Sequence, residues 1–254
     1  MDRRGFLRKT VLSGLGTAGL GGIGGFAGLG GLIARTASTG TQAADSTRWG
    51  LAIFTAAFHL NPEIIKACHQ AHNVPDIPDK KQEIKWIWED NARAAFTGGI
   101  PSRLAGELET RPFLLLCNHC ANPACVRVCP TGATFKRPDG VVGMDYHRCI
   151  GCRFCMAACP YGARSFNFHH PAPYLAAPNP AFPARMRGVV EKCSFCSGRL
   201  DLGLAPYCVE AAKDSMIFGN LNDPDSEISR VLRGRVSLTR RPELGTDPSV
   251  YYIM

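Results

Sequence analysis

Cysteines in closely spaced runs are the residues of this sequence whose type and spacing point most directly to chemistry. Twelve cysteines occur among the 254 residues. One run, Cys149–Pro160, has the spacing C-x₂-C-x₂-C-x₃-C followed by proline. In proteins with two [4Fe–4S] clusters, three thiolates of such a run bind one cluster and the fourth binds its neighbour. The run therefore predicts a partner run elsewhere in the chain.

The partner run is Cys117–Pro130, which has two extra residues between its second and third cysteines. The sequence Cys-Pro-x-Gly-Ala starts at Cys129 and again at Cys159, so the runs belong to two similar halves. Crossed ligation predicts cluster one on Cys117, Cys120, Cys125 and Cys159, and cluster two on Cys149, Cys152, Cys155 and Cys129. Each half is expected to contain a cluster-binding loop, a short helix that carries the fourth cysteine, and flanking strands. The turn signal Pro138–Gly140 predicts a strand over 141–145.

The remaining four cysteines are Cys68, Cys193, Cys196 and Cys208. With the two runs, they resemble the pattern of the four-cluster iron–sulfur subunits of dimethyl sulfoxide, polysulfide and tetrathionate reductases. The resemblance implies that these four cysteines bind a third [4Fe–4S] cluster. It also implies that the ligands of a fourth cluster are missing together, because their positions hold Phe58, Asn61, Ile64 and Ala212. The twelve cysteines thus complete three clusters with none left over.

The same resemblance implies an α+β fold of two fused ferredoxin-like (double [4Fe–4S]) modules with loop-rich insertions. We expect a ferredoxin-type iron–sulfur domain over residues 44–254. Within it, the resemblance implies an intact two-cluster module over about 112–168 and a one-cluster module from about 48–75 plus 190–225.

Local patterns predict a few elements before the first run. The sequence favours a strand at Trp49–Ile53, a helix from Glu63 to about His69, and a half-buried strand within Glu83–Glu89. Trp86 and Trp88 in the last segment belong either to the core or to a docking patch for a partner subunit.

The first 43 residues are expected to be an export signal. Arg3-Arg4, followed by Phe6-Leu7, resembles the twin-arginine signal. The apolar stretch 11–34 contains ten glycines, which makes it unlike a stable membrane span. A Gly-x-Gly-x-x-Gly match begins at Gly14, but it lacks the preceding strand and the later acidic residue of a dinucleotide site. The resemblance implies a periplasmic protein exported with its cofactors inserted; cleavage after residue 43 or retention of the segment stays open.

The net charge of +8 does not indicate nucleic-acid binding. Half of this charge lies in residues 1–43, and each thiolate-bound [4Fe–4S] cluster adds about −2. Disulfides and structural zinc are the competing interpretations of the cysteines, but the tight runs of four favour polynuclear clusters. His119 inside the first run is expected to hydrogen-bond the loop backbone. Arg148, Arg153 and Lys192 either raise cluster potentials or are solvated surface residues.

The sequence contains no nucleophile–base pair, nucleotide loop or open metal site, which indicates an electron carrier that is not catalytic alone. Three clusters, the twin-arginine segment and the ending Leu244–Tyr252 resemble most the periplasmic O subunit of the transmembrane complex associated with dissimilatory sulfite reductase. That resemblance implies a polytopic quinone-reactive membrane subunit and a multihaem cytochrome c as partners, in sulfur metabolism, with no small-molecule substrate of its own. The alternative is the iron–sulfur subunit of a molybdopterin oxidoreductase; a zinc-stabilised structural module is the alternative from another class.

Overall fold

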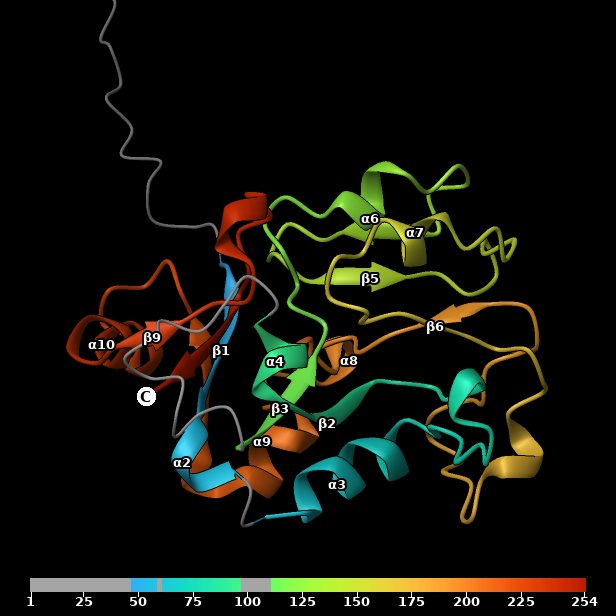
Figure 1. The fold of residues 1–254 in the computed structure, drawn as a ribbon, viewed down its shortest axis with the longest axis horizontal. Helices are drawn as coiled ribbons and strands as arrows, with labels where there is room; N and C mark the ends of the chain where they lie inside the picture. The colour runs from blue at the N-terminus through green and yellow to red at the C-terminus, as the bar shows by residue number, and fades with distance from the viewer. Residues whose placement is uncertain (1–46, 59–60, 97–110) are drawn as a thin grey trace, which may run out of the picture. The chain divides into compact units, whose positions relative to one another are not determined.

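The computed structural model describes residues 47–58, 61–96 and 111–254, drawn as coloured ribbon in Figure 1. These residues belong to one compact unit, Thr41–Met254. The expected twin-arginine segment lies outside the described residues. None of the described helices has the length and apolar character needed to cross a membrane.

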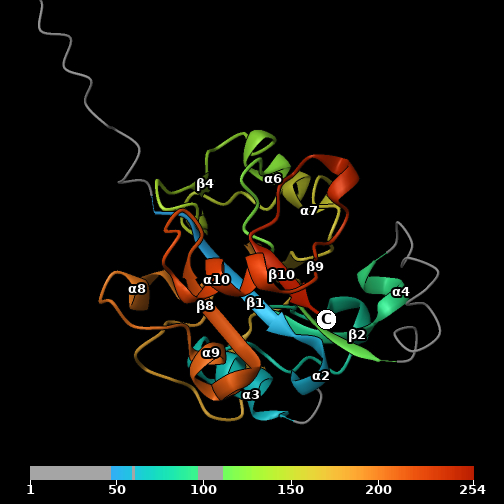
Figure 2. The same cartoon turned by 90° about the vertical axis from the view of Figure 1, so that its left-hand side faces the viewer.

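A four-stranded sheet joins the two ends of the described chain. Figure 2 shows its strands side by side, in the order β8 (Met216–Asn220), β1 (Trp49–Phe54), β10 (Val250–Ile253) and β9 (Ser237–Leu238). β1 runs antiparallel to β8 and parallel to β10, so the expected strand at Trp49–Ile53 is confirmed at the centre of the sheet. Helix α10 (Glu227–Gly234) packs on this sheet, where Ile228 contacts Ala52 and Ile253.

A second pair of strands leads into the first cysteine run. β2 (Ile87–Asn91) pairs antiparallel with β3 (Pro112–Leu116), and helix α4 (Ala92–Ala95) follows β2. The strand expected within Glu83–Glu89 therefore begins only at Ile87. Residues before Ile87 turn aside, because the Lys85 amide donates to Ser165 Oγ (2.8 Å) and the Trp86 indole donates to Glu191 (2.9 Å). Trp86 is a core residue, whereas Trp88 is half-buried.

Two short helices lie side by side in the segment that contains both runs (Figures 1 and 2). α6 (Ala124–Arg127) and α7 (Phe154–Ala157) occupy equivalent places in the repeat. Each carries the third cysteine of its run and ends before the fourth, so the expectation that the fourth cysteine is helical is wrong. The fourth cysteine precedes proline, and a residue before proline is disfavoured in helical backbone.

Strand pairs flank these helices. β4 (Thr134–Lys136) pairs with β5 (Val142–Met144) across the turn that was expected at Pro138–Gly140. β6 (Ser165–Phe166) pairs with β7 (Val190–Glu191), and the long connection between them includes a 3₁₀ turn at Ala172–Tyr174.

The lower part of Figure 1 contains α2 (Thr55–Phe58), α3 (Glu63–Ala71) and α9 (Tyr207–Ala212), and α3 and α9 carry two of the remaining cysteines. The chain also forms α8 (Ser197–Leu200) and 3₁₀ turns at Lys80–Gln82, Lys213–Ser215 and Pro242–Leu244. The helix expected from Glu63 is confirmed and extends two residues beyond His69. α3 packs on α9, and the buried residues Ile64 and Ala212 belong to one hydrophobic core there.

Candidate functional site: three groups of cysteines

The structure brings the twelve cysteines together in three groups of four, and each group lines one cavity. Site one contains Cys117, Cys120, Cys125 and Cys159; site two contains Cys129, Cys149, Cys152 and Cys155; site three contains Cys68, Cys193, Cys196 and Cys208. The cavities at sites one, two and three have volumes of about 360, 270 and 340 Å³, including space open to solvent. These groups coincide with the three sets that crossed ligation and the family resemblance predict.

Site three is assembled from distant segments. Cys68 lies on α3 and Cys208 on α9, while Cys193 and Cys196 lie in the loop between β7 and α8. Two successive left-handed residues, Phe195 and Cys196 (φ 51° for both), turn this loop so that the Phe195 amide donates to Cys193 Sγ at 3.4 Å. Burial and the neighbouring thiolates of the same site raise the pKa of Cys68 well above its usual value.

Site one lies beneath the C-terminal segment. Cys117 follows β3, and the backbone amides of Ala121 and Asn122 donate to the carbonyls of Asp247 and Thr246 at 2.8 and 3.0 Å. Thr246 also lines the site-one cavity. Burial, together with the neighbouring Cys117, raises the pKa of Cys120 to about 12, with Thr246 acting in the opposite direction. The segment that contains Thr246 and Asp247 therefore closes one side of site one.

Site two is the most open of the three sites. Cys152 is the one cysteine that is exposed. Its loop requires glycine at position 151, where φ is +70° and a Cβ atom would lie 2.4 Å from the Gly188 carbonyl oxygen. Burial raises the pKa of the Cys129 thiol, but hydrogen bonds from Thr134 and Thr131 outweigh it and the net shift is downward.

Residues that lie between neighbouring sites show the order in which the three sites are arranged. His119 of the site-one loop stacks on Phe195 of the site-three loop, with ring centroids 3.7 Å apart and an angle of 18° between the rings. Arg164 lines site one; burial lowers the pKa of its guanidinium, but the nearby thiolates of Cys125 and Cys155 outweigh this and the net shift is upward. Site one therefore lies between site three and site two.

His119 behaves as a structural residue rather than a ligand. It is buried, and its Nδ1 accepts a hydrogen bond from the backbone amide of Val142 at 3.1 Å. The expectation of a hydrogen bond to backbone is confirmed, although the donor belongs to β5 and not to the cysteine loop. Because Nδ1 is the acceptor, the proton of the neutral ring is on Nε2.

The three cationic residues that were expected beside the ligands occupy different environments. The Arg148 side chain is 67% exposed and pairs with Asp145. Arg153 lies over the rings of Phe166 and Phe168, at 5.3 and 5.9 Å from the centroids. Lys192 is buried, and its Nζ donates to the carbonyl oxygens of Val142 and Cys193. Of the three, only Lys192 places a buried charge directly behind a cysteine loop.

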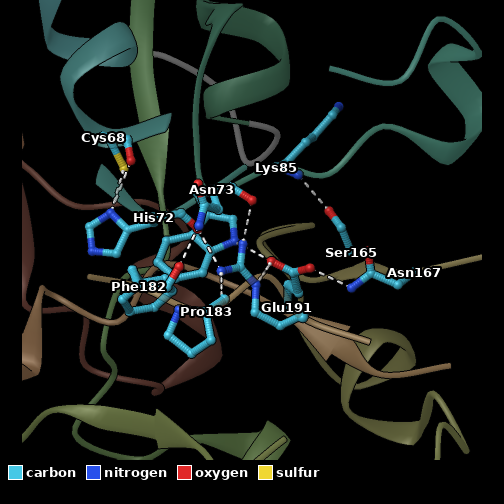
Figure 3. Close-up of polar contacts among 11 residues, drawn as sticks. Cys68, His72, Asn73, Lys85, Ser165, Asn167, Phe182, Pro183 and Glu191 are labelled. Carbon is cyan, nitrogen blue, oxygen red and sulfur yellow. Dashed lines mark hydrogen bonds and ion pairs between the residues drawn. The ribbon is translucent and has the colours of Figure 1, made fainter. Parts of the chain in front are cut away.

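A buried ion pair supports the turn that follows Cys68. Arg185 Nε lies 2.7 Å from Glu191 Oε2, with side chains 2% and 0% exposed. Figure 3 shows Glu191 in the same region as Cys68, His72 and Asn73. Arg185 donates to the carbonyls of His72 (2.5 Å) and Asn73 (2.9 Å), while Glu191 accepts from Trp86 and Asn167. Sequence reasoning missed this pair and Arg164, because neither belongs to a local motif that could have revealed it.

The polar atoms around the cavities fit an iron–sulfur cluster. Arg164 Nη2 and the side-chain amide of Asn118 are buried without a hydrogen-bond partner, and both residues line the site-one cavity. Cluster sulfur is a hydrogen-bond acceptor that such donors could serve. Within the described ranges, no group of three or more His, Cys, Asp or Glu side chains is arranged to hold a metal ion. Each of the three cavities is lined by four cysteines, the number of thiolates that holds a [4Fe–4S] cluster.

This arrangement defines the class of protein as an iron–sulfur protein built around a ferredoxin-like core. The 4Fe-4S dicluster domain family matches residues 110–172, the segment that contains both cysteine runs.

Relatives that match most of the chain include two iron–sulfur subunits. The Hdr-like menaquinol oxidoreductase iron-sulfur subunit 1 of Archaeoglobus fulgidus is 38% identical over 280 aligned positions, covering 99% of this chain and 97% of that protein. The menaquinone reductase iron-sulfur cluster-binding subunit of Nitratidesulfovibrio vulgaris is 33% identical and covers 81% of this chain and 88% of its own length. A putative iron-sulfur subunit of dimethyl sulfoxide reductase from Halobacterium salinarum is 47% identical, but the match covers 58% of this chain and 57% of that protein.

The chain belongs to the family of iron–sulfur subunits that includes these menaquinol oxidoreductase and dimethyl sulfoxide reductase-type proteins. It is an iron–sulfur electron-transfer subunit.

Proposed function

We propose that this protein carries three [4Fe–4S] clusters and relays electrons within a membrane-associated oxidoreductase complex. The observation that carries the proposal is the grouping of all twelve cysteines around three cavities in the sets that crossed ligation requires. When bound, the clusters supply reversible one-electron transfer. The cysteines would hold them, and the relatives, which are iron–sulfur subunits of oxidoreductase complexes, support a chain that transfers electrons for a catalytic partner subunit.

The protein's own residues organise the relay in the order site three, site one, site two. The stacked rings of His119 and Phe195 occupy the space between sites three and one. Arg164 lies between sites one and two and offers a positive charge to both. Packing of α3 on α9 occupies the region expected for a fourth cluster, with buried Ile64 and Ala212. The two fused ferredoxin-like modules that the resemblance implies are then one module with two clusters and one module that has lost one of its two clusters.

The twin-arginine resemblance and the relatives support a location and a set of partners. We infer export to the periplasm and association with a polytopic quinone-reactive membrane subunit and a multihaem cytochrome c, as in the complex linked to dissimilatory sulfite reductase. Two relatives are named for menaquinol or menaquinone chemistry, which supports a quinone-reactive partner. The alternative, a subunit of a molybdopterin reductase, is supported by the dimethyl sulfoxide reductase relative. Purification of the tagged complex and identification of its subunits would separate the two.

Metal analysis with EPR of the reduced protein tests the cluster count. We expect about twelve irons per chain, four for each cluster, with acid-labile sulfide to match and no zinc. Three zincs and no paramagnetic signal would refute the proposal and support the zinc-stabilised module.

Two cysteine variants test the assignment of ligands. Cys68→Ala is expected to remove the EPR signal of site three alone, and Cys152→Ala that of site two alone, because each residue lines a single cavity. The two variants are matched controls for one another. Loss of the same signal in both, or survival of all signals in Cys68→Ala, would show that Cys68 is wrongly assigned.

A further inference from the structure

The segment 240–247 lies over site one, although it is distant from both cysteine runs in the sequence. Arg241 Nη1 donates to the carbonyl oxygen of Pro160, the last residue of the second run, at 3.0 Å. In the first run, the side-chain amide of Asn122 donates to the carbonyl oxygen of Gly245 at 3.1 Å. The segment is therefore attached to both runs, and its position over the site-one cavity is fixed by the fold.

Two hydroxyl groups meet at this cavity. The hydroxyl of Tyr161 forms a hydrogen bond with Thr246 Oγ1, and both side chains are buried. Both residues line the cavity together with Cys120. Burial and the neighbouring Cys117 raise the pKa of the Cys120 thiol to about 12, and a hydrogen bond with the Thr246 side chain acts in the opposite direction. Tyr161, Thr246 and Cys120 thus form a connected series of polar groups.

The acceptors that are present assign the hydrogens of this series. Each hydroxyl has one hydrogen to donate. If Thr246 donated to Tyr161, the phenol hydrogen would have no acceptor among the described residues. If Tyr161 donates to Thr246, the threonine hydrogen is free for Cys120, and an ionised acceptor such as a thiolate ligand makes the stronger hydrogen bond. The order Tyr161 to Thr246 to Cys120 is the one that pairs both hydrogens.

The equivalent ligand of site two lies in a different environment. Cys152 is the second cysteine of its run, as Cys120 is of the first, but Cys152 is exposed and Cys120 is only partly so. Water can donate hydrogen bonds to an exposed ligand sulfur, whereas the segment over site one restricts its access to Cys120. Thr246 is placed to supply at Cys120 the donor that water supplies at Cys152.

We infer that Thr246 raises the reduction potential of site one by donating a hydrogen bond to Cys120, with its hydroxyl oriented by Tyr161. Reduction adds one electron, and therefore one negative charge, to a thiolate-bound cluster. A hydrogen-bond donor stabilises the more negative form more strongly, so it favours reduction. Tyr161 acts through Thr246 and is a positioning residue. The inference rests on the proposed cluster at site one, the middle site of the relay.

Redox titration of the cluster-loaded full chain, followed by EPR, tests this inference. Thr246→Val keeps the shape of the side chain and removes the hydroxyl. It should shift the reduction equilibrium of site one by about tenfold toward the oxidised form, which is about 59 mV for one electron, and leave sites two and three unchanged. Thr246→Ser keeps the hydroxyl and should restore most of the shift. Tyr161→Phe should shift site one in the same direction by a smaller factor, because Thr246 keeps its hydrogen but loses the group that orients it.

Thr55→Val is the matched control. Thr55 is also buried, and its hydroxyl donates to the carbonyl oxygen of Ile253 at 3.0 Å, but it lines none of the three cysteine cavities. The same loss of a buried hydroxyl should leave all three potentials unchanged. Deuterium ENDOR of protein exchanged into D₂O gives a second measurement, in which Thr246→Val should lose the coupling of one exchangeable proton at site one.

Unchanged site-one potentials in Thr246→Val and Tyr161→Phe, with full iron content, would overturn the inference, and so would a Thr246→Ser variant that behaves like Thr246→Val. If Thr246→Val loses iron, Tyr161→Phe decides, because it leaves the segment 240–247 intact. Iron analysis and EPR of the wild-type protein separate this failure from failure of the proposed function. Without a cluster at site one the proposed function fails; with the cluster present and its potential unmoved in the variants, only the role of Thr246 fails.

Discussion

The buried Arg185–Glu191 pair gives the sharpest test of how the fold supports site three. In Glu191→Gln the side chain keeps its shape and one acceptor oxygen, but Arg185 loses its counter-ion in a site where both side chains are at most 2% exposed. Breaking a buried ion pair by removing one partner costs about 3–5 kcal/mol, and the retained amide places this variant near the lower end. For a unit of about two hundred residues, 3 kcal/mol corresponds to a fall in Tm of roughly 6–12 °C.

The assay is thermal unfolding of the loaded protein under anaerobic conditions, followed by circular dichroism at one fixed scan rate because cluster loss makes unfolding irreversible. Glu63→Gln is the matched control. It breaks a pair with Lys66 whose side chains are 63% and 58% exposed, so we expect a Tm shift below about 2 °C. We also expect Glu191→Gln to lose the site-three EPR signal before the other two on mild heating, since Arg185 holds the carbonyls of His72 and Asn73, in the turn that ends the helix of Cys68. A Tm within about 2 °C of wild type would refute the role assigned to this pair.

Three further variants probe the residues between and behind the sites. Arg164→Met should lower the potentials of sites one and two by on the order of 100 mV and leave that of site three unchanged, and Arg164→Lys should restore most of the shift. Redox titration followed by EPR measures the potential of each site. Equal shifts at all three sites would contradict the position of Arg164 between sites one and two. Lys192→Gln should lower the potential of site three in the same titration, because the ammonium behind Cys193 is lost, whereas Arg148→Gln, at an exposed arginine, should not. His119→Phe keeps the stack on Phe195 but leaves the Val142 amide unpaired, so a loss of about 1–3 kcal/mol with unchanged iron content is expected in thermal unfolding; loss of site-one iron would instead make His119 essential to cluster binding.

The ligand sets could be predicted from the sequence because most of their information is local. Sites one and two are specified by the spacing inside two short runs and by the repeat that relates them. Cys68 is different, since it lies 125 residues before Cys193 and no local pattern joins them. It was assigned through the family resemblance, and the packing of α3 on α9 brings it to the other three.

The residues that support the sites could not be predicted, because their partners are distant in the sequence and the residues belong to no local motif. Arg185 contacts backbone 112 and 113 residues earlier in the chain, through a loop without regular spacing. The strand near Trp86 was misplaced for the same reason: tertiary hydrogen bonds to Ser165 and Glu191 draw the chain away before pairing with β3 begins. The periodicity of apolar residues predicts which side chains are buried, but it does not predict which distant groups form hydrogen bonds with the backbone.

Arg164 shows what an internal repeat can still reveal. Its equivalent in the first half is Thr134, and Arg164 Nη1 donates to Thr134 Oγ1 at 3.2 Å. Equivalent residues of the two halves can meet each other only near the axis that relates the halves. Cys125 and Cys155, each the third cysteine of its run, approach the same guanidinium. A charge at this axis acts on both sites at once, so one arginine in one half suffices where the other half has threonine. A departure from the repeat at such a position therefore indicates a residue shared between the two sites, which local spacing alone would not single out.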